Sequence, residues 1–344
     1  MSTRIAVIGA GLIGATHIDA VQKASGVALA AIIDPSDHAG LVAARAQVAH
    51  FRSLEAALDA GALDAAIVAT PNETHVPLGL HLIEAGIPAL IEKPVADTVA
   101  DGVALAQRAQ ARGVPILVGH HRRYNPMIRA VRAAIESGAF GQLVSAHISA
   151  TMAKPAAYFE TPFRIAPETG GPLTLNLIHE IDMLRFFFGE VAQVIGDTSN
   201  AQRGHAVEDT AAAILRFEGG GMATLNVTDA GCGPWSYDLG AGESRGLPRH
   251  DGIYAHIYAG TKAGISLPDG RVWRHPGSPD WTQKMAAAPL EFTPADPFTA
   301  QAAHLGAVAR GEAEPAVSCA DGVANVAVIA AIKESARQGA PVSL

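Results

Sequence analysis

The 344-residue sequence has only two cysteines, Cys232 and Cys319, and no excess of basic residues. Two isolated cysteines are too few for a disulfide framework or a thiolate metal site. The net charge of −8 argues against nucleic acid and an anionic membrane surface as partners. No apolar run is long enough to span a bilayer, and Met1 leads almost directly into a strand without a leader pattern. We therefore expect a cytoplasmic protein.

Composition and pattern indicate two domains. Hydrophobic residues make up 49% and charged residues 17% of the chain, as in an ordinary globular α/β protein, and the length exceeds that of one core. Over residues 1–122 apolar strands alternate with helices, which predicts a doubly wound parallel sheet. Residues 123–344 carry successive strands, which predicts an α+β domain with a large, mostly antiparallel sheet. The strands are expected at 143–151 and near 191–199, 209–218, 221–230, 253–259 and 263–267. The final helices, near 297–311 and 320–337, are expected to pack back on the first domain.

A glycine-rich turn follows the first predicted strand, and the second strand ends in Asp34. The dinucleotide-binding fingerprint consists of a strand, a glycine-rich turn, a helix and a second strand that ends in an acidic residue. Here the turn is Gly9-Ala-Gly-Leu-Ile-Gly14. We expect Gly9 to make the tight turn, Gly11 to let the backbone approach a pyrophosphate, and Gly14 to let helix pack on strand. The first N–H groups of the helix lack internal partners and favour an anion.

Asp34 indicates which dinucleotide binds. It lies twenty residues after Gly14, where its carboxylate can accept hydrogen bonds from both ribose hydroxyls. The same carboxylate would repel a 2′-phosphate, so the sequence predicts NAD rather than NADP. The alternative is a plain glycine turn with Asp34 capping the helix after Pro35, and it leaves the strand, helix and acid around the turn unexplained.

Two more polar segments follow predicted strands of the first domain: residues 70–75, Thr-Pro-Asn-Glu-Thr-His, and residues 92–94, Glu-Lys-Pro. Ligands of parallel sheets bind at the carboxyl ends of the strands, so these segments should meet the glycine turn at one crevice. The predicted cofactor contacts are Gly9, Gly11, Leu12, Ile13, Gly14, Asp34, Pro35, Ala69, Thr70, Pro71, Asn72, His75, Glu92 and Lys93.

Lys93 is the first catalytic candidate. It stands where the nicotinamide should lie, and Pro94 restricts its backbone. Most lysines are solvated surface charges, but the place of Lys93 at the strand end favours a role in the reaction. An ammonium there could stabilise a developing alkoxide and contact the substrate.

A helix after Gly170-Gly171 supplies the second candidate. Asn176, His179 and Asp182 are spaced by three and should line one stripe beside a buried apolar stripe. An imidazole, with an ordinary pKa of about 6.5, is suited to take an alcohol proton. The alternative is a core histidine bonded to Asp182. The stretch has no recognisable zinc spacing, so no metal is predicted. The buried stripe is expected to consist of Leu177, Ile181, Leu184 and Phe188.

Several cations could hold substrate hydroxyls or a carboxylate, although some should be plain surface charges. They are Arg122, Arg123, Lys154 and Arg164. The predicted substrate contacts are Lys93, Arg123, Tyr124, Arg164, Asn176 and His179. The polar inventory suits a polyol, an aldose, an inositol or a carboxylated cyclic dihydrodiol.

The order of the motifs in this chain resembles that of the Gfo/Idh/MocA family of NAD(P)-dependent oxidoreductases. The motifs are the glycine turn, Thr70-Pro-Asn72 with His75, Glu92-Lys93-Pro94, Arg123-Tyr124 and the His179 helix. The resemblance covers essentially the whole chain. It implies a Rossmann domain, an α+β domain whose open sheet builds homodimers or homotetramers, and oxidation of sugars, inositols or dihydrodiols. It also implies that Lys93 contacts nicotinamide and hydroxyl, and that His179 accepts the proton.

One position departs from the family. Its helix often has an aspartate four residues before the histidine, where this chain has Leu175. Asn176 is the available polar group, so the carboxylate-assisted proton relay stays open here. Two other functions also stay open: a redox-neutral NAD-using glycosidase or epimerase, and a non-catalytic NAD-binding regulator.

Overall fold

The computed structural model describes residues 2–167, 169–243 and 246–344. The chain forms two compact units. Unit 1 contains residues 1–124 and 295–326, and unit 2 contains residues 125–294 and 327–344. Among the described residues, no helix combines the length and the hydrophobicity needed to cross a membrane.

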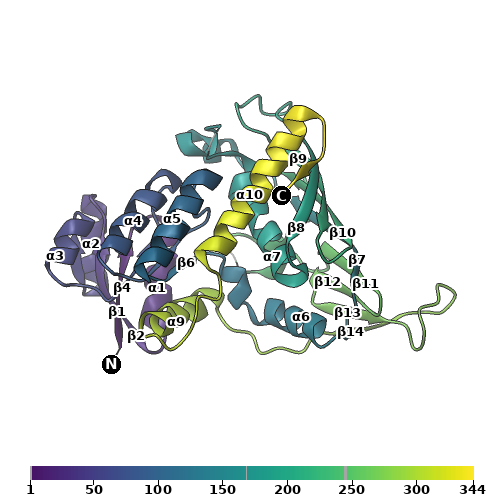
Figure 1. Cartoon of the computed structure of the whole chain (residues 1–344), viewed down its shortest axis with the longest axis horizontal. Coiled ribbons are helices and arrows are strands. Elements are labelled where there is room, and N and C mark those ends of the chain that lie inside the picture. The colour runs from purple at the N-terminus through teal and green to yellow at the C-terminus, as the bar shows by residue number, and fades with distance from the viewer. Residues whose placement is uncertain (1, 168, 244–245) are drawn as a thin grey trace. The chain divides into compact units, whose positions relative to one another are not determined.

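Unit 1 is built on a six-stranded parallel sheet with the order β3-β2-β1-β4-β5-β6 (Figure 1). The order reverses between β1 and β4, which places the topological switch point after these two strands. The doubly wound sheet expected from the sequence is therefore confirmed. The strands are β1 (Thr3–Ile8), β2 (Val27–Ile33), β3 (Ala49–Phe51), β4 (Ala65–Val68), β5 (Ala89–Ile91) and β6 (Ile116–Val118).

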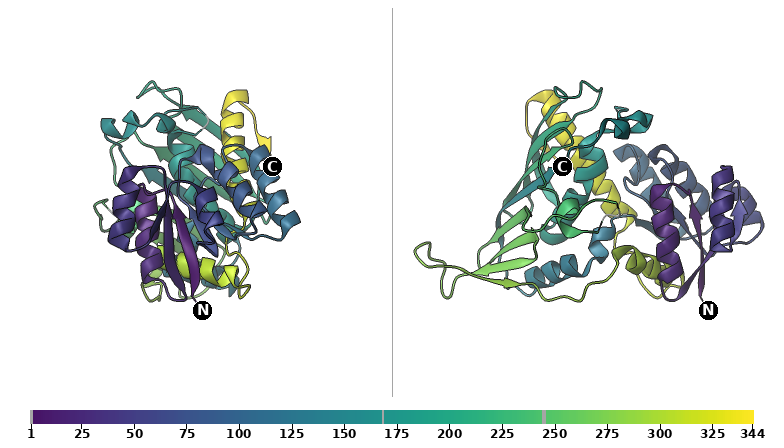
Figure 2. Two further views of the ribbon diagram at one scale, coloured as in Figure 1. Left: turned by 90° about the vertical axis from the view of Figure 1, so that its left-hand side faces the viewer. Right: turned by 180° about the vertical axis from the view of Figure 1, so that it is seen from behind.

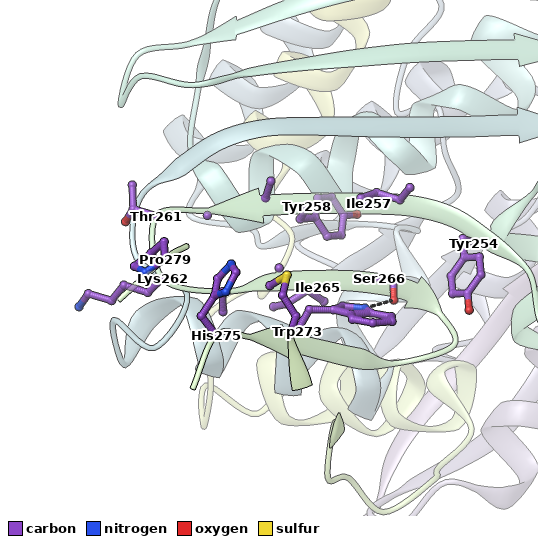
Figure 3. Close-up of a pocket in the computed structure, with 15 residues that line it drawn as sticks. Tyr254, Ile257, Tyr258, Thr261, Lys262, Ile265, Ser266, Trp273, His275 and Pro279 are labelled. Carbon is purple, nitrogen blue, oxygen red and sulfur yellow. Dashed lines mark hydrogen bonds between the residues drawn. The ribbon is translucent and has the colours of Figure 1, made fainter. Parts of the chain in front are cut away.

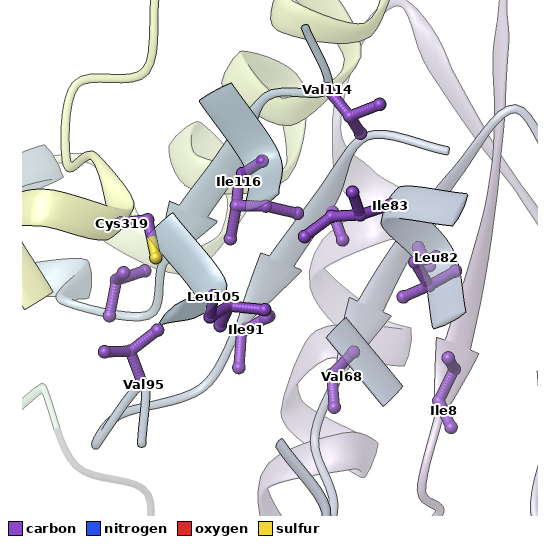
Figure 4. Packing of buried hydrophobic residues seen from close by; sticks show 14 of the residues in the cluster. Ile8, Val68, Leu82, Ile83, Ile91, Val95, Leu105, Val114, Ile116 and Cys319 are labelled. Carbon is purple, nitrogen blue, oxygen red and sulfur yellow. The ribbon is translucent and has the colours of Figure 1, made fainter. Parts of the chain in front are cut away.

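Helices cover both faces of this sheet (Figures 1 and 2). Successive residues of β1 alternate between two cores, with Ile8 in one and Val7 in the other. Figure 4 shows the core that contains Ile8, Leu82 and Leu105. The helices are α1 (Leu12–Lys23), α2 (Asp37–Ala46), α3 (Leu54–Asp59), α4 (His75–Glu84), α5 (Val99–Arg112) and α9 (Pro297–Ala309), with 3-10 turns η1 (Asn72–Thr74) and η2 (His121–Tyr124).

Unit 2 contains a nine-stranded sheet with the order β14-β13-β12-β11-β7-β10-β9-β8-β15. Only β7 and β10 pair in parallel among the described strand pairs of this sheet, so the expectation of a mostly antiparallel sheet is confirmed. The strands are β7 (Leu143–Thr151), β8 (Val191–Ser199), β9 (Thr210–Phe217), β10 (Met222–Thr228), β11 (Tyr254–Gly260), β12 (Gly264–Pro268), β13 (Arg271–Arg274), β14 (Ala286–Pro289) and β15 (Val342–Ser343).

The two faces of the unit 2 sheet differ. On one face Tyr258 of β11 meets the ring of Phe187, and Ser335 accepts a hydrogen bond from the backbone of Gly196 in β8. On the other face Ile257 and Met222 are about half exposed. The helices are α6 (Pro126–Glu136), α7 (Ile178–Phe188) and α8 (Tyr237–Ala241), with 3-10 turns η3 (Ala156–Glu160) and η4 (Pro162–Arg164) and a π-helical turn η5 (Leu173–Leu177). Helix α10 (Cys319–Gln338) begins in unit 1 and, from residue 327 on, belongs to unit 2.

Candidate cofactor and active site

The glycine turn of unit 1 has the geometry that its sequence predicts. Gly9 has φ +95°, and a Cβ there would lie 2.5 Å from the carbonyl oxygen of Ala69. A Cβ on Gly14 would lie 2.0 Å from the carbonyl oxygen of Gly9, so only glycine lets α1 approach the turn this closely. A Cβ on Gly11 would meet nothing within 4 Å. The open side of the turn is therefore at Gly11, at the N-terminus of α1, beside the 89% exposed Leu12.

Asp34 closes β2 directly beside this turn. Its Oδ2 atom accepts the backbone N–H of Ala10 at 2.9 Å, and its Oδ1 atom accepts that of Ser36 at 2.8 Å. Burial raises the pKa of Asp34, but hydrogen bonds from Ser36 and Ala10 outweigh it, so the pKa is lowered overall. The carboxylate therefore stays ionised and fixed at the edge of the turn.

The segment after β4 is held by its own side chains. The hydroxyls of Thr70 and Thr74 lie 2.5 Å apart. The ring nitrogens of His75 face two backbone carbonyls, Nδ1 that of Pro94 at 2.7 Å and Nε2 that of Thr70 at 2.9 Å. His75 is 1% exposed, so it ties the segments after β4 and β5 together. The Nδ2 atom of Asn72 is buried and has no hydrogen-bond partner among the described residues.

The Glu-Lys-Pro segment follows β5. Glu92 is buried, and its Oε1 atom lies 2.7 Å from Nε2 of His17 in α1. Its Oε2 atom accepts the backbone N–H of Lys93 at 3.2 Å. Burial raises the pKa of Glu92, but the bond and charge of His17, with the charges of Lys93 and His121, lower it to about 2. His17 was not predicted from the sequence, because its partner Glu92 lies 75 residues away in the chain.

These features of unit 1 fit a dinucleotide. The open backbone at Gly11 and the first N–H groups of α1 suit a pyrophosphate. The Asp34 carboxylate suits ribose hydroxyls, and the orphaned amide of Asn72 needs an acceptor that the described chain does not supply. The predicted cofactor residues from β1, β2, β4 and β5 thus meet at the carboxyl edge of one sheet.

In unit 2 the predicted helix does not start as a regular α-helix. Residues Leu173–Leu177 form a π-helical turn, and α7 begins at Ile178. A π-turn contains more residues per turn than an α-helix, so Asn176 does not continue the straight stripe expected from a spacing of three. His179 and Asp182 lie in α7 and are both buried, with exposures of 9% and 1%.

A carboxylate caps this π-turn. Glu208 accepts the backbone N–H of Leu173 at 3.0 Å, and a Cβ on Gly171 would lie 2.2 Å from its Oε1 atom. Burial raises the pKa of Glu208. The second glycine of the Gly-Gly pair is therefore needed for close approach of the cap, which the sequence did not reveal.

Asn176 is bonded to a buried lysine. The Nζ atom of Lys154 donates to Oδ1 of Asn176 at 2.6 Å and lies 3.7 Å from Oδ2 of Asp229. The same Nζ lies 4.4 Å from the centre of the Tyr158 ring, which also carries the Arg164 guanidinium at 4.0 Å. Three predicted polar groups, Lys154, Arg164 and Asn176, thus gather in one cluster of unit 2.

Two of the predicted cations lie inside unit 1. Arg122 is 1% exposed, and Arg123 is 7% exposed with its Nη2 atom 3.4 Å from Oδ1 of Asp321. Tyr124 is buried in the core and its ring lies 5.5 Å from that of His304. In unit 2, Glu180 pairs with His256 at 2.9 Å. Within the described residues, no group of three or more histidine, cysteine or acidic side chains is placed to hold a metal ion.

A hollow in unit 2 lies elsewhere, over strands β11 to β13 (Figure 3). It has a volume of about 570 Å³ and is lined by Ile257, Trp273, Met285 and other mostly apolar groups. It contains none of the predicted catalytic residues. Its apolar lining suits contact with another apolar surface.

Comparison with protein families agrees with this geometry. A family model described as "Oxidoreductase family, NAD-binding Rossmann fold" matches residues 3–120, and the GFO/IDH/MocA C-terminal domain matches residues 128–239. The fold and these two family matches therefore define an NAD(P)-dependent oxidoreductase acting on CH–OH groups. The chain belongs to the Gfo/Idh/MocA family, which confirms the resemblance predicted from its motifs.

Two curated relatives have named activities. The D-apiose dehydrogenase of Paraburkholderia graminis is 27% identical over 354 residues, covering 98% of this chain and 89% of the relative. Inositol 2-dehydrogenase 1 of Saccharopolyspora erythraea is 32% identical over 203 residues, 56% of this chain and 57% of the relative. The chain thus spans little more than half the length of that inositol dehydrogenase.

A solved structure shares the fold along the whole chain. The WlbA dehydrogenase of Bordetella pertussis, in complex with NADH and UDP-GlcNAcA, is 25% identical with a TM-score of 0.80. The match covers 100% of this chain and 99% of WlbA. It supports NAD(H) as the cofactor of the shared fold.

Proposed function

We propose that this oxidoreductase oxidises a secondary alcohol of a sugar or polyol, or reduces the corresponding ketone. The observation that carries the proposal is the strand-edge arrangement of unit 1, where Lys93 after β5 lies at the same carboxyl edge of the sheet as the glycine turn after β1 and Asp34 after β2. Relatives named for D-apiose and inositol support a polyhydroxylated substrate.

The residues divide the chemistry between them. NAD supplies the hydride acceptor when bound. We assign to Lys93 the stabilisation of negative charge on the alcohol oxygen, because an ammonium favours an alkoxide. We assign to His179 the acceptance of the hydroxyl proton at an imidazole nitrogen. Asn176, Arg164, Arg123 and Tyr124 remain the proposed substrate-positioning groups, with the first two in the cluster of unit 2.

NAD rather than NADP is the proposed cofactor. The ionised Asp34 carboxylate is held by two backbone N–H groups and would repel a 2′-phosphate. Asp34→Ser should lower the KM for NADP at least tenfold and raise that for NAD, because one repulsive charge and two ribose bonds are lost. Steady-state kinetics with both cofactors measure the change. An unchanged preference would contradict the role of Asp34.

The direct test is a screen of polyols, sugars and sugar acids with NAD and NADP, following absorbance of the reduced cofactor. Lys93→Ala should lower kcat about a hundredfold or more and leave the Kd for NADH within a few-fold. Lys284→Ala, the same change at an exposed lysine, serves as the control. Unchanged kcat in Lys93→Ala would refute the assignment, and tightly held cofactor with no net NADH would favour a redox-neutral reaction.

The proposed assembly is a homodimer or homotetramer formed through the face of the unit 2 sheet that carries Ile257 and Met222. The hollow over β11 to β13 and the 48% exposed Ile257 support it. Ile257→Glu should shift the species seen by light scattering toward the monomer, because a charge would be buried at the contact. Leu41→Glu, at an exposed leucine of unit 1, is the control. A monomeric wild-type protein would overturn the proposal.

A cytoplasmic location also remains a proposal. It is supported by two cysteines that form no disulfide, Cys232 and Cys319. Fractionation of cells that express the native gene would test it, and recovery outside the cytoplasm would refute it.

A further inference from the structure

The amide of Asn176 has a fixed orientation. Its Oδ1 atom accepts a hydrogen bond from Nζ of Lys154 at 2.6 Å. An ammonium has three donors and no acceptor, so the amide atom facing it must be the oxygen and not the nitrogen. The Nδ2 atom of Asn176 therefore points away from Lys154, and residue 176 can only donate on that side.

Lys154 is itself held on several sides. Its side chain is 6% exposed, its Nζ atom lies 3.7 Å from the Asp229 carboxylate, and the Tyr158 ring lies 4.4 Å away. Asp229 is 3% exposed and also pairs with Arg203 at 2.8 Å. A buried ammonium with a carboxylate and an aromatic face has little freedom to leave Asn176.

The cavity that Lys154 and Asn176 line together is too small for a substrate group. The cavity that Lys154 and Asn176 line with Asp229 and Glu180 has a volume of about 10 Å³. That is about the space required by a single water molecule. Lys154 is therefore placed to act on Asn176 rather than on a substrate carboxylate.

We propose that Lys154 is a positioning residue that orients and polarises the Asn176 amide, so that residue 176 serves the reaction as a hydrogen-bond donor. The inference rests on the proposed function and deepens it. A donor at residue 176 selects substrates that present an acceptor oxygen, a hydroxyl or carbonyl, next to the reacting carbon. The positive charge at Oδ1 makes the N–H groups of the same amide stronger hydrogen-bond donors.

The first experiment needs no substrate. In ¹⁵N spectra of the full chain, the Asn176 side-chain amide is assigned by its loss in Asn176→Ala. Lys154→Met should shift this pair of signals, because the ammonium at Oδ1 is removed, whereas Lys284→Met should not. Asn176 amide signals unchanged in Lys154→Met would overturn the proposal, whatever the enzyme's substrate is.

The second experiment is a double-mutant cycle in kcat/KM, using the alcohol that gives the fastest NADH formation in the screen. Lys154→Met and Asn176→Ala should each lower kcat/KM about tenfold or more, and the double variant should be no slower than Asn176→Ala alone. Lys154→Arg should recover part of the loss, because it keeps a cationic donor. Additive losses would show that Lys154 acts directly and would overturn the proposal.

The two proposals fail in different ways. If no alcohol in the screen is oxidised, the proposed function fails and the amide spectra still decide the role of Lys154. If Lys93→Ala is inactive but the cycle is additive, the dehydrogenase assignment stands and the positioning role does not. The Kd for NADH, measured in each variant, should stay within a few-fold of wild type.

Discussion

The imidazole of His17 and the carboxylate of Glu92 lie 2.7 Å apart inside unit 1, and both side chains are almost fully buried. The second oxygen of Glu92 accepts the backbone N–H of Lys93. A Cβ on Gly119 would lie 2.8 Å from the same carboxylate. Glu92 is thus enclosed on three sides, and it serves the cofactor site by fixing the backbone of the neighbouring lysine.

Glu92→Gln should lower the free energy of unfolding at pH 7 by about 3 kcal/mol, because the buried carboxylate beside His17 is replaced by an uncharged amide. The pKa of Glu92 is lowered to about 2 from an ordinary 4.5. Its ionised form therefore stabilises the fold above pH 4.5, and this contribution is lost as pH falls from 4.5 toward 2. Urea unfolding at several pH values should show the difference between wild type and Glu92→Gln narrowing over that range.

The control for this prediction is Glu218→Gln, because Glu218 is exposed at the end of β9. It should follow the wild type within about 0.5 kcal/mol at every pH. A gap between wild type and Glu92→Gln that stays constant down to pH 3 would show that the carboxylate is not preferentially ionised in the folded protein.

Two glycines of the turn should separate folding from cofactor binding. Gly14→Ala places a Cβ 2.0 Å from the carbonyl oxygen of Gly9, so it should strongly destabilise unit 1. Gly11→Ala meets nothing within 4 Å, so the fold should survive while the new methyl blocks the pyrophosphate. Thermal unfolding and NADH titration of both variants measure the contrast. A stable Gly14→Ala, or a Gly11→Ala that binds NADH like wild type, would contradict this division.

The two contacts of the His75 ring can be tested separately by substitution. The side-chain amide of asparagine can occupy the Nδ1 position facing Pro94, and that of glutamine can occupy the Nε2 position facing Thr70. His75→Gln should mainly lower kcat, about three- to tenfold, because the segment that carries Lys93 is released. His75→Asn should mainly raise the Kd for NADH, because the loop after β4 is released.

The measurement for His75 is a set of kcat values and NADH affinities for both variants. Leu41→Gln, at an exposed site of α2, should change neither quantity. Equal losses in kcat and affinity for both His75 variants would show that the ring has a general packing role instead.

The two cysteines should react very differently. Cys319 lies in the core of unit 1, where burial raises the pKa of its thiol to about 12, whereas Cys232 is exposed. At pH 8 iodoacetamide should label Cys232 in the native protein and Cys319 only after unfolding, since the thiolate is the nucleophile. Peptide mass spectrometry reads both sites. Fast labelling of Cys319 without denaturant would show that unit 1 opens readily there.

Strong local patterns predicted most of the fold. Apart from β3, the parallel strands of unit 1 are largely apolar runs with a Gly, Pro or acidic residue at one end or both. Strand pairs such as β9 and β10 have an evident glycine turn. The strands that the sequence did not predict, β3, β13, β14 and β15, have two to four residues each. Pairing with neighbours, which no local pattern reveals, is what makes such segments strands.

The parts of the candidate site that form from one short stretch of sequence could be predicted. The parts that depend on contacts between residues far apart in the sequence could not. The glycine turn and Asp34 are recognisable from spacing alone. His17 beside Glu92 and Lys154 beside Asn176 depend on contacts 75 and 22 residues apart in the sequence. The π-turn before His179 was missed because Leu173–Leu177 has no proline or internal glycine to mark it.

The π-helical turn at Leu173–Leu177 also limits how this site can change during evolution. Asn176 owes its place to the number of residues in that turn, as much as to its own chemistry. Replacing Leu175 would add a new group without moving Asn176. Loss of one residue would turn Asn176 by about 100° relative to the preceding chain while leaving α7 intact. A point substitution in this turn therefore changes which groups the active site contains, whereas a single-residue deletion changes the direction in which Asn176 points.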